Sequence, residues 1–235
     1  MKLLGFHIKR KNVIRYITKP YDILRSYNEQ KVFCIGLNKT GTTSLEKAMK
    51  DFGYLSGNQR EAERLFDKWV KRDFRKLIRH CKTAVFFQDA PFSFPYTFIA
   101  MDQAFPGSKF ILTIRDSPEQ WYASSINFYS KLWGKENKPP TADELKEARY
   151  MYKGFPYHSH RHLHRVTDSD LYNKEILIDY YTTHVKNVKD YFRFRKDDLL
   201  VLNVADDDGF KKLTTFLNVK TDKNKFPWEN RTDEK

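Results

Sequence analysis

Residues 32–44 read Val-Phe-Cys-Ile-Gly-Leu-Asn-Lys-Thr-Gly-Thr-Thr-Ser. The apolar run that opens this stretch predicts a buried strand, and Gly36 marks where the strand gives way to a loop. A helix is expected over 42–52, because Leu45, Met49 and Phe52 recur at helical spacing. A strand, a glycine-bounded loop and a helix in this order direct backbone N–H groups and a helix N-terminus toward a phosphate. The stretch therefore predicts a phosphate-binding loop in an α/β protein.

The position of the loop lysine separates two classes of enzyme. Gly36 and Gly41 have the spacing of the nucleotide-triphosphatase loop Gly-x-x-x-x-Gly-Lys-Ser/Thr, in which the lysine follows the second glycine. Here Thr42 follows that glycine, and the lysine is Lys39, inside the loop. On the loop crest, Lys39 is better placed for the bridging oxygen between a 5′-phosphate and its transferable group. Negative charge develops on that oxygen during in-line transfer, so a fixed cation there favours the transition state.

Three further apolar runs predict strands at 84–87, 109–114 and 199–204. Helices are expected over 60–81, 96–105, 118–132, 142–152, 170–193 and 209–217, and a short helix broken near Pro20 over 10–28. The alternation predicts an α/β three-layer sandwich with a central parallel sheet. In that architecture ligands bind beyond the carboxyl ends of the strands. The loops after Gly36, Phe87, Ile114 and Val204 are therefore where chemistry is expected.

Composition limits the class of protein and its surroundings. The 43 Lys and Arg against 30 Asp and Glu give a net charge of +13, which attracts anions. No apolar stretch approaches the roughly 20 residues that span a bilayer, and the apolar part of residues 1–11 is too short for a signal peptide. Cys34 and Cys81 form neither a disulfide framework nor a zinc site, and Cys34 is expected to be a buried free thiol. We expect a soluble, cytoplasmic protein whose basic leader, residues 1–30, could lie on an anionic membrane surface.

The phosphate loop resembles that of a known family. Lys39-Thr-Gly-Thr-Thr is similar to the 5′-phosphosulfate loop of the sulfotransferases that depend on 3′-phosphoadenosine 5′-phosphosulfate (PAPS), and residues 33–45 are similar to the branch with the pattern Gly-x-x-Lys-Thr-Gly-Thr-Thr-Ser. The steroid and phenol enzymes of the family have tryptophan where this chain has Ser44, so their acceptor specificity is not carried over. The resemblance covers about 31–130 and 172–230. It implies a P-loop nucleotide-binding sulfotransferase fold over 31–235, with a variable acceptor-side insert at about 131–170.

The resemblance also implies how the donor PAPS and its product, adenosine 3′,5′-bisphosphate, are held. Arg115 follows the clearest strand, and an arginine there can hold a phosphate with a two-pronged contact. By resemblance, Arg115 and Ser124 bind the 3′-phosphate, with Ser125 as the alternative serine. No metal is required if lysine and the helix N-terminus supply the positive charge. The residues expected to cradle the 5′-phosphosulfate are Lys39, Thr40, Gly41, Thr42 and Thr43.

The acceptor, a hydroxyl or amine, must lose a proton as it attacks. In the segment Phe-Phe-Gln-Asp-Ala-Pro at 86–91, Asp89 stands just beyond a strand end that faces the loop. We predict Asp89 as the general base. Alternatively it caps or orients a neighbour, a histidine is the base, or Asp89 binds magnesium in a small-molecule kinase that uses ATP. A nucleic-acid or anion-binding module is a further alternative, but no nucleic-acid motif supports it.

Two groups of residues are candidates for the acceptor side. His158, His160, His162 and His164 alternate along the chain, which would place all four on one face of a strand as a transition-metal cluster, whereas a helix would spread them. A cationic acceptor-facing surface or a solvated loop are the other interpretations. We predict no metal site, and the acceptor is expected to be a small molecule or a glycan. The aromatic residues that could line its pocket, or simply belong to the core, are Phe92, Phe94, Tyr96 and Trp133.

Overall fold

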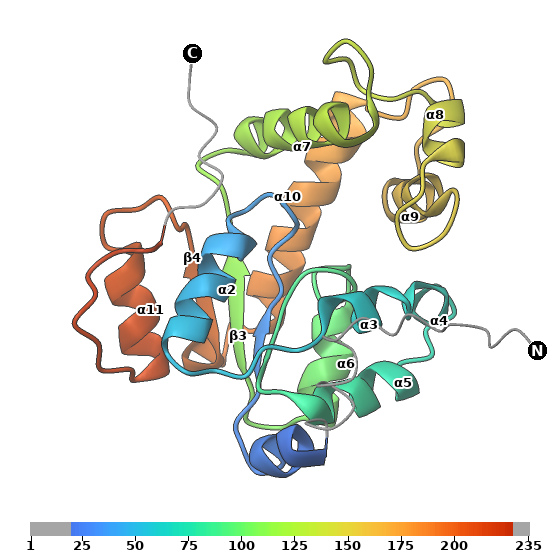
Figure 1. Cartoon of the computed structure of the whole chain (residues 1–235). Coiled ribbons are helices and arrows are strands. Elements are labelled where there is room, and N and C mark those ends of the chain that lie inside the picture. Colours follow the sequence, from blue (N-terminus) through green and yellow to red (C-terminus); the bar gives the residue numbers. More distant parts are fainter. Residues whose placement is uncertain (1–19, 228–235) are drawn as a thin grey trace, which may run out of the picture.

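The structure, a computed structural model, describes residues 20–227. At its centre is a sheet of four parallel strands in the order β2-β1-β3-β4 (Figure 1). The strands are β1 (Val32–Cys34), β2 (Phe86–Phe87), β3 (Lys109–Thr113) and β4 (Leu199–Leu202). Each lies within an apolar run that predicts a strand, so the parallel α/β sheet is confirmed.

Helices cover both faces of this sheet. Neighbouring residues of β1 point to opposite faces, as the pleat of a strand requires: Phe33 and Cys34 belong to two different buried clusters. The cluster around Cys34 is closed by α2 (Thr42–Asp51) and α11 (Gly209–Leu217). The cluster around Phe33 is closed by α5 (Arg75–His80), α6 (Thr97–Ala104) and α10 (Lys174–Tyr191). The predicted three-layer sandwich is therefore confirmed, and Cys34 is a buried free thiol as expected.

The strand order determines where a ligand can bind. The chain leaves β1 for β2 on one side and then crosses to β3 on the other side of β1. A crevice opens beyond the carboxyl ends of the strands at such a switch point. The loops that follow β1 and β3, residues 35–41 and 114–117, therefore meet at this crevice.

The helix predicted over 60–81 is wrong as a single element. It is divided into α3 (Gln59–Glu63), α4 (Phe66–Val70) and α5, with Arg72 in the left-handed region at φ 55°. The break allows α4 to pack Phe66 and Trp69 against Phe94, while α5 packs toward the cluster around Phe33. Tertiary packing of aromatic side chains thus overrides the continuous helical pattern.

The segment after α7 (Pro118–Trp133) forms two helices beside α7 and α10 (Figure 1). They are α8 (Ala142–Glu147), shorter than the predicted 142–152, and α9 (Phe155–His164). The histidine run lies on α9, so the extended strand that would have brought four histidines together is wrong. Gly154, at φ 81°, is the N-cap of α9, and Pro156 lies in its first turn, where proline is favoured because a missing N–H costs no helical hydrogen bond. Similarly, the Asn173 side chain caps α10, which begins four residues later than predicted.

The N-terminal expectations fall mostly outside the described residues. Of the helix expected over 10–28, residues 20–26 are helical and 10–19 are not described. The basic leader proposed to contact a membrane is likewise largely outside them. Within 20–227, no helix combines the length and apolar character needed to cross a bilayer.

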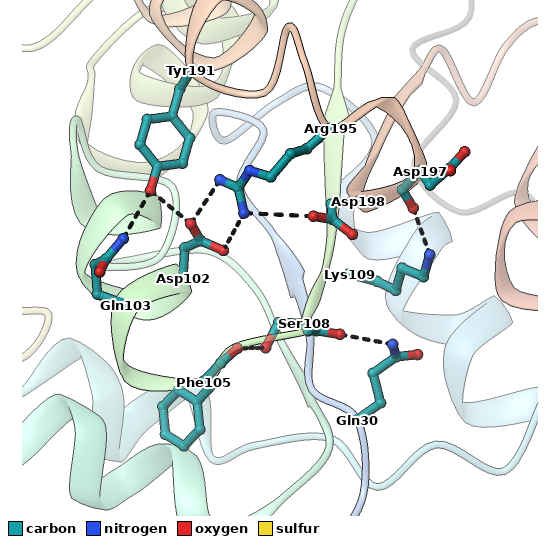
Figure 2. Close-up of polar contacts among 11 residues, drawn as sticks. Gln30, Asp102, Gln103, Phe105, Ser108, Lys109, Tyr191, Arg195, Asp197 and Asp198 are labelled. Atoms are coloured by element: carbon teal, nitrogen blue, oxygen red, sulfur yellow. Dashed lines mark hydrogen bonds and ion pairs between the residues drawn. The ribbon is translucent and has the colours of Figure 1, made fainter.

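An ion pair between buried Asp102 and the more exposed Arg195 fixes the helical layer at the other end of the sheet. Asp102 on α6 accepts two hydrogen bonds from the Arg195 guanidinium, at 3.0 and 2.8 Å, and one from Tyr191 at 2.6 Å (Figure 2). Nearby, Lys109, the first residue of β3, donates to the backbone oxygen of Asp197. Burial alone would raise the pKa of Asp102, but the bonds from Arg195 and Tyr191 bring it below its ordinary value.

We predict that Arg195→Met lowers the free energy of unfolding by about 1–3 kcal/mol, because it leaves a buried carboxylate short of its main partner. The matched control is Lys186→Met, which removes an exposed pair with Asp190 one helical turn away and should cost under about 0.5 kcal/mol. Since the pKa of folded Asp102 is depressed, this stabilisation is present at neutral pH and is lost in acid, below about pH 4. Urea unfolding at neutral pH and in acid measures the stabilisation. Equal effects of the two variants at neutral pH would contradict the role assigned to the Arg195–Asp102 pair.

Candidate functional site

The phosphate loop is anchored through its carbonyl groups. The Nε2–H of buried His184 donates to the Ile35 carbonyl at 2.8 Å, and the Trp121 indole donates to the Asn38 carbonyl at 3.0 Å. Because a trans peptide points its C=O and N–H in opposite directions, each anchored carbonyl also fixes the direction of the following N–H. Side chains of α7 and α10 thus hold the loop in one conformation.

Two further loop carbonyls, those of Lys39 and Leu37, are also anchored by side chains. The Arg115 Nε donates to the Lys39 carbonyl at 2.6 Å. The Thr40 hydroxyl is completely buried, donates to the Leu37 carbonyl and lies 2.5 Å from the Thr113 hydroxyl of β3. The Thr40 side chain is therefore used inside the loop, and only its backbone N–H could serve a ligand.

The two loop glycines are required for different reasons. A Cβ on Gly36 would lie 2.0 Å from the Thr113 Oγ1, so the loop could not lie against β3 with any larger residue. Gly41 has φ +94°, which favours glycine, and a Cβ there would lie 2.3 Å from the Val204 side chain. Val204, in the segment that follows β4, thus packs against the loop at Gly41.

Helix α2 presents its N-terminus at the loop. Gly41 is its N-cap residue, and no side chain caps the first turn. The N–H groups of the first turn have no partner within a helix, and the helix dipole adds a partial positive charge. Thr42 is buried and Thr43 exposed at this end of the helix. The geometry is that of an anion-binding site.

A cleft of about 490 Å³ lies over the loop, within the range of roughly 300–1,000 Å³ that is usual for ligand pockets. It brings together every residue predicted for the site except Thr40. Of the two alternative serines on α7, Ser124 lines this cleft and Ser125 does not. The lining residues are Asn38, Lys39, Gly41, Thr42, Thr43, Ser44, Asp89, Arg115, Ser124, Asn127, Phe128, Lys131 and Leu132.

The cleft concentrates positive charge. Burial and the neighbouring Arg115 lower the pKa of Lys39, and burial also lowers that of Arg115. The Lys39 ammonium lies 4.2 Å from the centre of the Phe128 ring. Lys131 adds another cation to the wall. An anionic ligand would relieve the mutual repulsion of these groups, which makes the cleft an anion site by charge as well as by backbone geometry.

Asp89 stands at the floor of this cationic cleft. It accepts a hydrogen bond from the Thr42 hydroxyl at 3.3 Å. Burial raises its pKa to about 6, with the carboxylates of Glu63 and Glu46 adding to the shift against the opposing hydrogen bond from Thr42. Both Asp89 and Lys39 have left-handed backbones, with φ of 55° and 73°. Non-glycine residues in this region are uncommon and cluster at functional sites.

Sequence analysis missed one wall of the cleft, although its spacing could have been found. Ser124, Asn127, Phe128 and Lys131 are separated by three, one and three residues, which places them on one face of α7. Only Ser124 was predicted. The stripe places polar side chains on a helix face that would otherwise be expected to pack against the core. These polar residues at helical spacing are the sequence signal for this wall of the cleft.

A second, smaller cavity of about 80 Å³ adjoins the cleft and shares Asn38, Lys39 and Phe128 with it. Ser125 and Tyr180 line this cavity. Of the aromatic residues considered for an acceptor pocket, only Phe94 does so. Phe92 belongs to the core, Tyr96 is exposed, and Trp133 packs against the cluster around Leu145.

The histidine run does not form a metal cluster. On α9, His160 and His164 are one turn apart and line the small cavity, with ring centres 4.6 Å apart, so a helix does bring this pair together. His158 and His162 are exposed. Among residues 20–227, no group of three or more His, Cys, Asp or Glu side chains is arranged to hold a metal ion.

Comparison with known proteins identifies the family. A family model described as a sulfotransferase domain matches residues 31–235. The match spans most of the chain, so the chain belongs to the sulfotransferase domain family, which supports sulfotransfer as its general activity. A search of curated proteins found no match.

We predict that Gly41→Ala lowers the free energy of unfolding by about 2–4 kcal/mol, the sum of roughly 1 kcal/mol for the left-handed backbone and 1–3 kcal/mol for the clash with Val204. Gly53→Ala is the matched control: Gly53 has φ +85° but no atom within 4 Å of an added Cβ, so it should show only the backbone cost. Denaturant unfolding measures both. Equal losses would show that the contact with Val204 does not constrain the loop.

Proposed function

We propose that the protein transfers a sulfuryl group from PAPS to a hydroxyl or amine. The observation that carries the proposal is that Lys39, within the loop, lines one cleft with Arg115 and Ser124. The N–H groups of 39–43 and the N-terminus of α2 would hold the 5′-phosphosulfate. Arg115 and Ser124 would hold the 3′-phosphate, the group that distinguishes this donor from ATP.

The proposed transfer needs a base on one side of sulfur and a cation on the other. The acceptor oxygen or nitrogen forms a bond to sulfur while the bond between sulfur and the bridging oxygen of the donor breaks. The acceptor proton passes to the Asp89 carboxylate. The electron pair of the broken bond stays on the departing 5′-phosphate, where Lys39 stabilises the added charge. Lys39, Arg115 and the α2 N-terminus supply the positive charge in this scheme, and we propose that no metal is required.

Asp89 suits the role of base by geometry and by acidity. It lines the same cleft as Lys39, and the Thr42 hydroxyl orients one of its oxygens. A base is most effective when its pKa lies near the working pH, and the pKa of Asp89 is about 6. The carboxylate is therefore ionised at neutral pH but more basic than an exposed aspartate.

Adenosine 3′,5′-bisphosphate should bind by calorimetry in the presence of a metal chelator, and ATP with magnesium should bind much more weakly. We expect Lys39→Ala and Arg115→Ala each to weaken bisphosphate binding about 10–100-fold, because each removes a charge-assisted contact with a phosphate. Arg115→Lys should recover only part of the loss, since lysine keeps the charge but not the two-pronged geometry.

Lys138→Ala, which removes an exposed lysine outside the cleft, is the control and should bind like the unmodified protein. Thermal unfolding of each variant checks that loss of binding is not loss of fold. Binding of ATP with magnesium in preference to the bisphosphate would refute the donor assignment and favour a kinase.

Asp89→Asn should reduce turnover about 10²–10⁴-fold while leaving bisphosphate affinity within a factor of about three, because the amide cannot accept the proton. In the unmodified protein, turnover at limiting acceptor should fall tenfold per pH unit below about pH 6, where Asp89 becomes protonated. Asp143→Asn, on the exposed surface of α8, is the control. A variant at Asp89 with normal turnover would exclude it as the base.

A further inference from the structure

The small cavity beside the cleft carries features that donor binding does not use. It lies among α7, α9 and α10, and its walls are largely aromatic or aliphatic. Because Asn38, Lys39 and Phe128 line both hollows, the cavity opens where the transferable group of the donor is proposed to lie. Its position is therefore that of the acceptor, and this part of the argument rests on the proposed function.

Three buried polar atoms, on side chains that line the cavity, lack partners. The Nδ1 atoms of His160 and His164 and the hydroxyl of Tyr172 make no hydrogen bond to any described residue. All three side chains line the cavity, and the His160 ring centre lies 5.3 Å from that of Tyr172. Buried polar groups without a partner are rare in folded proteins, and each requires an explanation. A ligand with its own polar group would satisfy them.

The protonation state of His160 shows what kind of group it would accept. Its Nε2 lies 2.7 Å from the Leu171 carbonyl oxygen, which can only accept, so Nε2 carries the proton. Burial lowers the pKa of His160 and keeps the ring neutral. Its Nδ1 is therefore an acceptor. Burial raises the pKa of Tyr172, so its hydroxyl stays protonated and can donate. One ligand hydroxyl can donate to the His160 Nδ1 and accept from the Tyr172 hydroxyl.

The same features disfavour a charged acceptor inside the cavity. An anion would lose its hydration among aromatic side chains such as Phe94 and Trp121, at a cost of several kcal/mol. It would also face the lone pair of the His160 Nδ1 and leave that nitrogen without a hydrogen bond. An ammonium group would be repelled by Lys39, and it has no lone pair with which to attack sulfur.

The size of the cavity limits the ligand further. Its volume of about 80 Å³ is smaller than the roughly 150 Å³ of a protein cavity that holds benzene. Only one ring, reaching out toward the cleft, or a short carbon chain can enter. A second sugar ring cannot enter, so of the two acceptor classes considered from sequence, the cavity favours a small molecule over a glycan.

We propose that the cavity binds a small uncharged acceptor with a hydroxyl group at each end of one ring or a short carbon chain. The inner hydroxyl is held by His160 and Tyr172. The outer hydroxyl lies at the mouth, where the cavity meets the cleft, and receives the sulfuryl group there. His160 and Tyr172 are thus specificity-determining residues, and α9 supplies the acceptor side of the site.

Three ligands that differ at one position test this assignment. They are 4-hydroxybenzyl alcohol, benzyl alcohol and 4-(hydroxymethyl)benzoate, which carry a hydroxyl, a hydrogen and a carboxylate opposite the same hydroxymethyl group. Each is titrated by calorimetry into the full chain, with and without saturating adenosine 3′,5′-bisphosphate. The test variant is Tyr172→Phe, which removes a hydroxyl that has no partner among the described residues and so should not weaken the fold. Tyr157→Phe, whose hydroxyl bonds Asp168 outside the cavity, is the matched control.

We expect 4-hydroxybenzyl alcohol to bind at least tenfold more tightly than either of the other two ligands. Tyr172→Phe should abolish its advantage over benzyl alcohol, and Tyr157→Phe should preserve it. Failure of 4-hydroxybenzyl alcohol to bind, equal or tighter binding of the benzoate, or no effect of Tyr172→Phe would each overturn the assignment. The titrations without nucleotide keep the two proposals separate. If the bisphosphate does not bind but the diol shows the expected pattern, the donor proposal fails and the cavity specificity stands.

Discussion

The site depends on one constraint: the carbonyl groups of the phosphate loop are tied back to the body of the protein. Anchors for Ile35 and Asn38 come from α10 and α7, and the anchor for Lys39 comes from the end of β3. With its carbonyl groups committed, the loop has a fixed set of N–H directions and a fixed place for its lysine. An anion site of this kind needs no reorganisation when a ligand arrives, and such preorganisation is the main source of electrostatic catalysis.

The same anchors connect the donor cleft to the acceptor cavity. Trp121 holds the loop from one side of α7, while the stripe from Ser124 to Lys131 forms a wall of the cleft, and Phe128 faces both hollows. Helix α7 is thus the shared wall of the proposed donor and acceptor sites. The proposed acceptor specificity depends on α9, which lies farther along the chain and is held by aromatic contacts such as that between Phe66 and Phe155. Acceptor choice could therefore change by substitution in α9 without disturbing the loop.

Sequence alone was sufficient for the sheet, the loop and most of the residues that line the cleft, because each depends on local pattern. Apolar runs specify buried strands, and the paired glycines specify the loop. It was not sufficient where tertiary packing decides: the aromatic contacts of Phe66 and Trp69 break a helix that the periodicity predicts as continuous. It also missed that Thr40 is used inside the loop, since its contact with Thr113 joins residues distant in sequence. Such contacts leave no periodic signal.

The most direct test of the central claim is a crystal structure of the protein with adenosine 3′,5′-bisphosphate. We expect the 5′-phosphate on the N–H groups of 39–43 at the N-terminus of α2. The 3′-phosphate should lie against Arg115 and Ser124, with the loop unmoved. A nucleotide bound elsewhere, or bound in the reverse orientation with its 3′-phosphate on the loop, would contradict the account.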